Sequence, residues 1–265
     1  MKKITLIGGD LRMKILKEKL ESNGFTVDTL GLFGADAADI KSSDAVILPV
    51  PTTKDKKTVF APLTNRRIYL EDLATALSSN QLVLCCNYTF GTKNCVNYGA
   101  LDSYALLNAV PTAEGAIKIA IENTPFTLWK SRVLVIGFGR VGKVLSGRLK
   151  AMECDVTVSA RKSADFALIN AMGLKYINTT LLREGVLPFD IVFNTVDAEV
   201  LDGDTFKRSK CALAIDLSSK GGFDLSAAES AGVKAIFAGG LPAKVAPHTA
   251  AEILFTTVTE IINDR

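Results

Sequence analysis

The sequence predicts an α/β protein with two doubly wound, Rossmann-like parallel-sheet domains and a ligand-binding cleft between them. Short apolar segments rich in Val, Ile and Leu recur along the chain, as expected for buried parallel strands, and segments with helical periodicity separate them. Residues 132–142, RVLVIGFGRVG, combine such a strand with the glycine spacing G-x-G-x-x-G. With 265 residues, the chain is also long enough for two domains of ordinary size.

The first predicted domain is flavodoxin- or Rossmann-like. It comprises residues 1–108 and is completed by a C-terminal helix at 249–265 that returns to pack on it. Its strands are predicted at four apolar segments: Lys3–Ile7, 25–30, 44–51 and 81–85. The polar, glycine-bearing segment 87–97 is predicted to be a loop. Asp10 and Arg12 follow the first strand. Ligands of open α/β sheets bind at the carboxyl ends of strands, so we expect both residues in a substrate-binding loop.

The segment before the second domain predicts a short helix at 101–108 and a longer helix that begins at Pro111, because proline favours the first turn of a helix. Thr112 and Glu114 would then lie at the N-terminal end of the longer helix, facing the cleft between the domains. Glu114 is the best acid/base candidate there. The alternative is that its charge only complements the helix dipole.

The second predicted domain, residues 109–248, carries a dinucleotide-binding loop. The loop consists of six consecutive residues: Gly137, Phe138, Gly139, Arg140, Val141 and Gly142. The first glycine permits a tight turn, the second lets the backbone approach a pyrophosphate, and the third lets the following helix pack close to the strand. The N–H groups at the N-terminus of that helix would bind the phosphates. A tightly packed α/β turn without a ligand is the alternative.

The end of the next strand predicts NADP rather than NAD as the cofactor. In NAD-preferring sites this strand usually ends in an acidic residue that accepts a hydrogen bond from the ribose 2′-OH. Here the sequence is Ser159, Ala160, Arg161 and Lys162, without a carboxylate. A hydroxyl and two cations suit a 2′-phosphate, because hydrogen bonds to charged groups contribute about 1.5–3 kcal/mol each. A solvent-exposed basic turn is the alternative.

Later strand ends complete the predicted cofactor site. The residues expected to contact the cofactor there are Asn194, Thr195, Val196, Asp216, Leu217 and Ser218. The final helix is predicted at 250–262, opened by a capping box between Thr249 and Glu252. His248, the only histidine, stands just before that helix and is either a catalytic residue or a surface neighbour of the helix cap.

The composition of the chain argues against nucleic-acid-binding, membrane-spanning and metal-binding proteins. Hydrophobic residues make up 48% and charged residues 22% of the chain, as in globular proteins, and the net charge of +3 comes without a basic run that would bind nucleic acid. No apolar run approaches the length of about 18 residues that a membrane span needs. The five cysteines lack metal-ligand spacing, so we expect no metal, reduced thiols and a cytoplasmic protein. Cys95, in its polar loop, is either reactive or incidental.

The residues expected around the cleft suit an anionic, carboxylate-bearing substrate. They supply cations and hydrogen-bond donors: Arg12, Thr112, Ser219, Lys220, Lys244 and His248. Hydride transfer needs little from the protein beyond positioning and charge complementarity, because the cofactor carries the reaction.

Six segments, spread over nearly the whole chain, resemble those of the A subunits of dipicolinate synthases, a family of spore-forming bacteria. They are residues 8–12, 108–116, 137–142, 159–162, 216–222 and 240–250. The resemblance implies NADP-dependent oxidation of dihydrodipicolinate, formed from a cyclic tetrahydrodipicolinate precursor, to dipicolinate. This step would belong to a branch of lysine biosynthesis used in sporulation. The resemblance also implies the B subunit of dipicolinate synthase as a partner, and we expect a homo-oligomer.

The resemblance also implies roles for individual residues. The substrate carboxylates are expected to bind to Arg12, Thr112, Lys220, His248 and Thr249, and Asp10 and Ser219 are further expected substrate residues. Glu114 is expected to act as acid/base for a ring proton or for loss of water, with Thr112, Lys220 and His248 as further catalytic residues. Two other functions stay open. One is an NADPH-dependent enzyme like the 2-hydroxyacid dehydrogenases, and the other is a non-catalytic, cofactor-binding component of a heteromeric complex.

Overall fold

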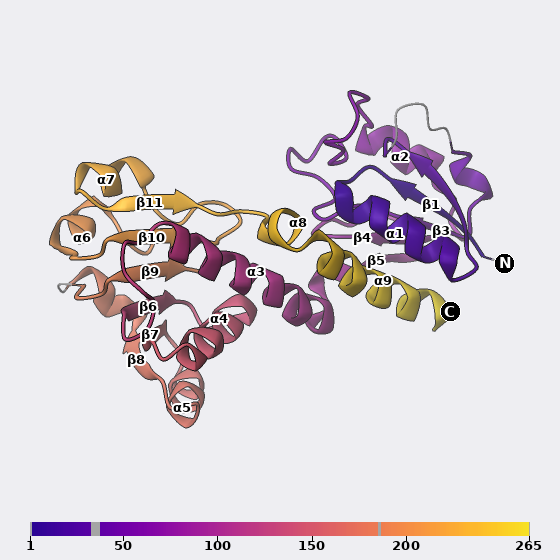
Figure 1. The fold of residues 1–265 in the computed structure, drawn as a ribbon. Helices are drawn as coiled ribbons and strands as arrows, with labels where there is room; N and C mark the ends of the chain where they lie inside the picture. Colours follow the sequence, from indigo (N-terminus) through magenta and orange to yellow (C-terminus); the bar gives the residue numbers. More distant parts are fainter. Residues whose placement is uncertain (1, 33–37, 185–186, 265) are drawn as a thin grey trace. The chain divides into compact units, whose positions relative to one another are not determined.

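The computed structural model describes residues 2–32, 38–184 and 187–264. The chain forms two compact units, one made of Met1–Asn108 with Pro242–Arg265 and the other of Ala109–Leu241. Each unit has its own parallel sheet with helices packed on it (Figure 1). No helix among the described residues is long and apolar enough to cross a lipid bilayer.

The first unit contains a five-stranded parallel sheet. Its strands are β1 (Lys3–Ile7), β2 (Thr26–Leu30), β3 (Ala45–Ile47), β4 (Leu82–Cys85) and β5 (Cys95–Asn97). Their order, β2-β1-β3-β4-β5, is flavodoxin-like and places the topological switch point between β1 and β3. The predicted doubly wound fold is confirmed. The prediction that 87–97 is only a loop is wrong, because β5 pairs with β4 as an edge strand. With 3 residues, β5 is too short for a periodic sequence signal.

Helices bury both faces of this sheet. The unit contains α1 (Leu11–Ser22), α2 (Leu70–Ala76), α9 (Pro247–Asn263), and the 3-10 helices η1 (Ile40–Ser42) and η2 (Tyr98–Ala100). Alternate strand residues point to opposite faces. Leu6 and Ile47 pack in one cluster with Leu16 of α1 and Leu254 of α9, whereas the other face packs against α2. The C-terminal helix α9 is therefore part of the first unit's core.

The start of α9 differs from the prediction. The helix begins at Pro247, the first helical residue, and not after a capping box at Thr249. Proline fixes φ near its helical value and has no N–H to leave unpaired, so it starts the helix earlier than the Thr249-x-x-Glu252 pattern indicates. Glu252 instead forms an ion pair with Lys19 of α1. The preceding short helix is α8 (Leu241–Val245).

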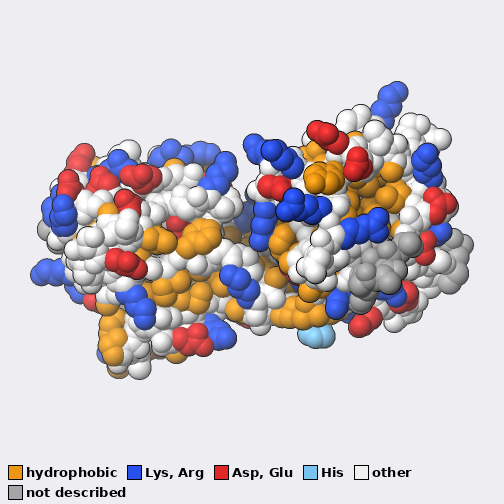
Figure 2. Space-filling model, turned by 90° about the horizontal axis from the view of Figure 1, so that it is seen from above, with side chains coloured by type: hydrophobic (Ala, Val, Ile, Leu, Met, Phe, Trp, Pro, Cys, Tyr) orange, Lys and Arg blue, Asp and Glu red, His pale blue; other side chains and the backbone are white. Residues whose placement is uncertain are grey.

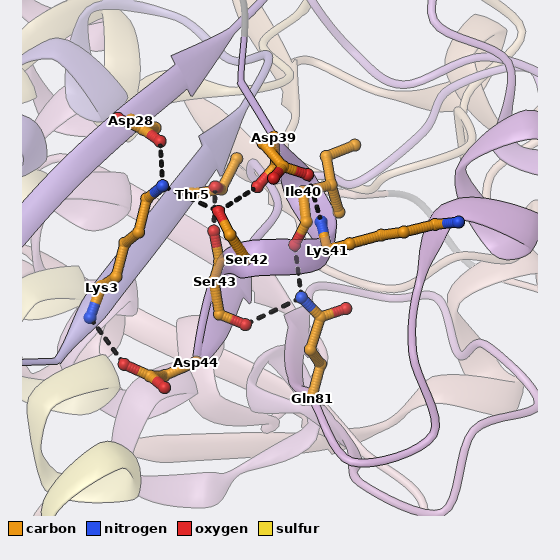
Figure 3. Close-up of polar contacts among 10 residues, drawn as sticks. All are labelled: Lys3, Thr5, Asp28, Asp39, Ile40, Lys41, Ser42, Ser43, Asp44 and Gln81. Atoms are coloured by element: carbon orange, nitrogen blue, oxygen red, sulfur yellow. Dashed lines mark hydrogen bonds and ion pairs between the residues drawn. The ribbon is translucent and has the colours of Figure 1, made fainter.

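A network of hydrogen bonds and ion pairs connects η1 to the strands near their amino ends (Figure 3). The side chain of Gln81, which is buried, donates to the carbonyls of Ile40 and Ser43, the latter at 2.8 Å. The buried hydroxyls of Thr5 and Ser43 bond to each other. Lys3 pairs with Asp28 at 2.9 Å. These contacts lie at the end of the sheet opposite to its predicted ligand-binding loops, so their role is to hold the fold.

A single helix, α3 (Asp102–Glu122), occupies the segment where two helices were predicted. Pro111 lies inside it. An internal proline removes one helical hydrogen bond. The helix nevertheless continues, because Ala109 and Ala113 keep the buried face unbroken across the proline. The prediction that a helix begins at Pro111 is therefore wrong.

The second unit contains a six-stranded parallel sheet. Its strands are β6 (Arg132–Ile136), β7 (Asp155–Ala160), β8 (Lys175–Asn178), β9 (Ile191–Asn194), β10 (Leu213–Asp216) and β11 (Lys234–Phe237). The order β11-β10-β9-β6-β7-β8 is that of dinucleotide-binding Rossmann folds, with the switch point between β6 and β9. The predicted fold class is confirmed here too.

Helices flank this second sheet (Figure 1). They are α4 (Arg140–Ala151), α5 (Ser163–Ala171), the 3-10 helix η3 (Thr179–Arg183), α6 (Gly203–Arg208) and α7 (Leu225–Ser230). The core contains Leu134, Ile136 and Val192 from central strands, packed with Phe206 of α6. Strand β8 lies at the sheet edge with exposed or half-buried side chains, and it lacks the apolar run that marks the central strands.

Candidate cofactor and substrate sites

The three glycines of the predicted dinucleotide loop have distinct physical roles. Gly137 has φ +96°, a left-handed conformation that favours glycine. A Cβ atom on Gly142 would lie 2.1 Å from the carbonyl oxygen of Gly137, so only glycine lets α4 pack this close to the turn. A Cβ atom on Gly139 would meet nothing within 4 Å. The first and third glycines are therefore required by the chain itself, whereas the second leaves open space where a ligand can approach the backbone.

The N-terminus of α4 begins at this open position. Gly139 is the N-cap residue and has no side chain to bond the first N–H groups of the helix. Arg140 beside it is exposed, and Phe138 is buried with its ring 5.3 Å from the Lys143 ammonium. A helix end with this geometry can bind a phosphate group through main-chain N–H groups and the positive end of the helix dipole.

The polar residues after β9 hold the switch point together. The Thr195 hydroxyl donates to the Ile136 carbonyl at 2.8 Å, which joins the ends of β9 and β6. Asn194 is fully buried. Its side-chain amide donates to the Val196 carbonyl at 2.9 Å, and its amide oxygen accepts from the Val196 N–H at 3.1 Å. The side chains of Asn194 and Thr195, predicted to contact the cofactor, thus shape the backbone that borders Gly137.

Asp216 organises the neighbouring loop after β10. Its carboxylate is buried and accepts four hydrogen bonds. One oxygen accepts from the Asn194 side chain at 2.9 Å and from the Ser218 N–H at 3.0 Å. The other accepts from the Gly222 N–H at 2.5 Å and from the Phe223 N–H at 3.2 Å. All four hydrogen bonds come from the protein, so the carboxylate of Asp216 shapes this loop, and its predicted contact with a cofactor stays a prediction.

The loop that Asp216 holds presents several of the predicted residues. Leu217 is half-buried, whereas Ser219 and Lys220 are exposed. Ser219 is oriented by Asp197, which accepts from its N–H at 2.6 Å and from its hydroxyl at 2.9 Å. The buried hydroxyl oxygen of Ser218 has no hydrogen-bond partner among the described residues. The loop therefore exposes Lys220 to a ligand, whereas the Ser218 hydroxyl lies buried behind it.

The end of β7 differs in one respect from the prediction. Ser159 is fully buried, and its hydroxyl oxygen accepts a hydrogen bond from the Thr179 hydroxyl at 3.1 Å. This hydroxyl is thus turned into the sheet and not toward a 2′-phosphate. Ala160 is also buried, whereas Arg161 and Lys162 are exposed at the start of α5. The cationic half of the predicted site is accessible, and its hydroxyl is not.

Asp10 and Arg12 form a closed ion pair at the β1/β3 switch point. Asp10 caps α1, and the Arg12 guanidinium donates to its two carboxylate oxygens at 2.9 and 2.8 Å. The guanidinium also donates to the Val50 carbonyl at 2.5 Å. Burial alone would lower the pKa of Arg12, but the hydrogen bonds and charge of Asp10 outweigh it and raise the pKa. Arg12 is 7% exposed, so its first role is to hold the loops of the switch point.

Glu114 lies within α3, not at a helix N-terminus as predicted, because α3 begins at Asp102. Its carboxylate is exposed and lies 3.1 Å from the guanidinium of Arg148 in α4. Thr112 is half-buried on the same helix. An exposed ion pair of this kind contributes little to stability, so the structure leaves Glu114 accessible for a role in binding or proton transfer.

The remaining predicted substrate residues lie near the start of α9. His248 and Thr249 are exposed in its first turn, and Lys244 is exposed in α8. The pale blue histidine is visible at the surface in Figure 2. The structure thus brings His248 and Thr249 together in the first unit, whereas Lys220 and Glu114 belong to the second.

Two features of these sites escaped the sequence analysis. Asp197 orients Ser219. It directly follows residues 194–196, which were predicted to contact the cofactor, so its position in the sequence could have indicated a role. The contact between Cys85 and Cys95 depends on the pairing of β4 with β5, which the sequence does not predict. No group of three or more potential metal ligands occurs among the described residues.

Two doubly wound units, the second with an open glycine loop at its switch point, define the class of two-domain Rossmann proteins to which the D-2-hydroxyacid dehydrogenases belong. D-lactate dehydrogenase from Escherichia coli has this fold, with a TM-score of 0.63 and 16% identity over 98% of this chain and 96% of that chain.

A narrower relationship follows from the sequence and the structure together. Residues 3–106 match the N-terminal domain of the dipicolinate synthase A subunit. The chain is 31% identical to the dipicolinate synthase A subunit of Bacillus subtilis (strain 168), over 98% of this chain and 95% of that protein. The crystal structure of the Bacillus subtilis dipicolinate synthase A chain matches with a TM-score of 0.88 and 30% identity, over 99% of this chain and 96% of that chain. The chain belongs to the family of dipicolinate synthase A subunits.

Proposed function

We propose that this chain is an NADP-dependent oxidoreductase that oxidises dihydrodipicolinate to dipicolinate. The observation that carries the proposal is the 31% identity to the dipicolinate synthase A subunit of Bacillus subtilis over 98% of the chain. In this reaction the dihydropyridine ring loses a hydride to the nicotinamide and a proton to a base. The ring becomes aromatic, so the step is strongly favourable.

The residues around the glycine loop fit a dinucleotide. A pyrophosphate would lie at the open position of Gly139, against the N-terminal N–H groups of α4. The exposed Arg161 and Lys162 at the end of β7 support NADP over NAD, because they offer charge to a 2′-phosphate where NAD sites usually carry a carboxylate. The nicotinamide, when bound, supplies the hydride acceptor. The chain's own task is to orient the substrate ring and to receive its proton.

The substrate has two carboxylates, and the chain offers matching donors. Lys220, His248 and Thr249 are exposed, so each can bind a carboxylate directly. Arg12 is bonded to Asp10, and we propose that this pair positions the loops that follow β1 and β3. Thr112 of α3 and Ser219, which Asp197 orients, are the other proposed donors. Asp10 and Arg12 belong to the proposed substrate site through the loops that they position.

Glu114 is the proposed proton acceptor. Its carboxylate is exposed and lies 3.1 Å from the guanidinium of Arg148. We expect Glu114→Gln to lower turnover by about a hundredfold or more, as the loss of a general base does. Glu122→Gln is the matched control, because Glu122 is exposed on the same helix and pairs with Lys118 at 3.7 Å. Equal turnover in the two variants would exclude Glu114 as the base.

The decisive experiment supplies the purified chain with the cyclic precursor and either NADP or NAD. We expect NADP reduction together with the ultraviolet absorbance of the aromatic dicarboxylate. The assay is then repeated with the B subunit of dipicolinate synthase, which we propose as a partner in the cytoplasm. A separate light-scattering measurement tests the proposed homo-oligomer. NADP binding without turnover, whether or not that partner is present, would overturn the proposed reaction.

A further inference from the structure

The first unit contains a pair of thiols in contact at the edge of its sheet. Cys85 is the last residue of β4 and Cys95 the first of β5, and these strands pair in parallel. Their sulfur atoms lie 3.4 Å apart. Cys86, the next residue, belongs to the core cluster on the opposite face of the sheet. The contact is therefore specific to Cys85 and Cys95 and does not follow from the adjacent Cys85-Cys86 sequence.

The two thiols have different surroundings. Cys95 is partly exposed, and its sulfur accepts a hydrogen bond from the Phe90 N–H at 3.3 Å. Hydrogen bonding from Cys85, and then from this N–H, lowers the pKa of Cys95 to about 6. Cys85 is buried, and its sulfur lies 2.6 Å from the Tyr88 carbonyl oxygen. The hydrogen bond with Cys95 and burial both raise the pKa of Cys85. A partly exposed thiol with a lowered pKa thus faces a buried thiol with a raised pKa.

We propose that Cys85 and Cys95 form an oxidant-sensitive dithiol site, in which a peroxide converts the two thiols to an intramolecular disulfide. The Cys95 thiolate attacks one peroxide oxygen, the O–O bond breaks, and Cys95 becomes a sulfenic acid while the other oxygen leaves as hydroxide. The Cys85 sulfur then displaces the sulfenic hydroxyl group, which leaves as water with the Cys85 proton. In total, two thiols are oxidised to one disulfide and one hydrogen peroxide is reduced to two waters.

The edge of the sheet permits the movement that this step needs. A disulfide bond is about 2.0 Å long, so the two sulfurs must approach by roughly 1.4 Å from their separation of 3.4 Å. Strand β5 has 3 residues and pairs only with β4 among the described strands. Cys95 can therefore shift without breaking pairs on a second side. Cys95 lies opposite Val83, two residues before Cys85, so the two cysteines are diagonal neighbours across the strands. Such neighbours are about 7–8 Å apart, which is wider than most disulfides span, so the backbone of β5 must shift toward Cys85.

The dithiol site is linked to the switch point of the same unit. Cys86 donates its N–H to the Thr52 hydroxyl at 2.8 Å, and its carbonyl accepts from the Thr52 N–H at 3.0 Å. Thr52 follows Val50, whose carbonyl accepts from Arg12. The residue that follows Cys85 is thus hydrogen-bonded to the loop that borders the Asp10–Arg12 pair.

Peptide mapping of the full chain tests the proposal. The protein is treated with hydrogen peroxide, its remaining thiols are blocked with iodoacetamide, and it is digested with trypsin. Cleavage after Lys93 separates peptide 68–93, which contains Cys85 and Cys86, from peptide 94–118, which contains Cys95. We expect these two peptides to become linked, with the loss of two hydrogens, and dithiothreitol to release them.

Matched variants assign the bond. Cys85→Ser and Cys95→Ser should abolish the linked peptides, whereas Cys86→Ser should keep them. A linked pair that persists in Cys85→Ser and disappears in Cys86→Ser would overturn the proposal. So would oxidation of Cys95 to sulfinic acid in the wild-type chain without any link. The wild-type experiment alone decides this second point, so the test holds even if a variant does not fold.

A dithiol reagent gives an independent measurement in the absence of added oxidant. Phenylarsine oxide binds two neighbouring thiols together. We expect it to protect Cys95 from iodoacetamide in the wild-type chain and in Cys86→Ser. In Cys85→Ser, Cys95 should lose this protection by about tenfold or more, because one thiol binds the arsenic much more weakly than two do. Equal protection of Cys95 in the wild-type chain and Cys85→Ser would contradict the site.

Discussion

Replacing Asp216 with asparagine should destabilise the second unit strongly. Each carboxylate oxygen of Asp216 accepts two hydrogen bonds, from Asn194, Ser218, Gly222 and Phe223. In Asp216→Asn, one oxygen becomes an NH₂ group that faces two donors and can accept from neither. Hydrogen bonds to a charged group contribute about 1.5–3 kcal/mol each, so losing two lowers the free energy of unfolding by about 3–6 kcal/mol.

Urea unfolding followed by circular dichroism measures this effect, and NADP titration of the folded protein measures its consequence for the cofactor site. The matched control is Asp197→Asn, because Asp197 accepts two hydrogen bonds from Ser219 in the same region but is exposed. Water can replace those bonds, so we expect the control to change the free energy of unfolding by less than about 1 kcal/mol.

An Asp216→Asn protein whose free energy of unfolding changes as little as that of Asp197→Asn would contradict this prediction. That result would mean that the loop after β10 keeps its conformation without the carboxylate. A folded Asp216→Asn protein with unaltered NADP affinity would also contradict the view that this carboxylate shapes the loop beside the switch point.

Three further predictions concern the glycine loop, the cofactor and the thiols. Gly142→Ala should lower the free energy of unfolding by about 1–3 kcal/mol, because its Cβ atom would lie 2.1 Å from a backbone oxygen. In Gly139→Ala the added Cβ atom meets no protein atom within 4 Å, so this variant should weaken NADP binding in a titration without destabilising the fold. Arg161→Ala should reduce the preference for NADP over NAD, measured as a ratio of dissociation constants, by about tenfold or more; an unchanged ratio would exclude its 2′-phosphate contact. Only the thiolate reacts, so alkylation of Cys95 by iodoacetamide should rise with pH to a plateau with a midpoint at pH about 6, whereas Cys86, with a pKa raised by burial to about 12, should stay unreactive at neutral pH.

The features that sequence predicted well are those set by local requirements of the backbone. Buried parallel strands need unbroken apolar runs, so Lys3–Ile7 and Arg132–Ile136 were visible without a structure. The glycine loop was visible for a similar reason. Gly137 must adopt a left-handed conformation and Gly142 must lack a Cβ atom. Both requirements select glycine, so the sequence alone shows them.

The features that sequence missed depend on contacts between distant segments. Proline starts α9 at Pro247 but lies inside α3 at Pro111, because the packing of the flanking residues decides whether a helix continues. Ser159 has the right type for a phosphate contact, yet the neighbouring Thr179 takes its hydroxyl into the sheet. The four donors around Asp216 come from segments on both sides of β10, and no local pattern reveals that they converge.

At both switch points, the buried charged side chains are bonded within the protein, whereas the exposed charged side chains are accessible to ligands. In the first unit the buried Arg12 is paired with Asp10, and in the second the buried Asp216 is bonded to Asn194 and main-chain N–H groups. Unpaired buried charges are costly, so these groups must stay bonded within the protein whether or not a ligand is present. The exposed cations near the ends of β7 and β10 are the groups that we propose for anionic ligands. Substitutions at those exposed cations should therefore alter ligand preference while the fold is kept, whereas substitutions at the buried pairs should affect the fold first.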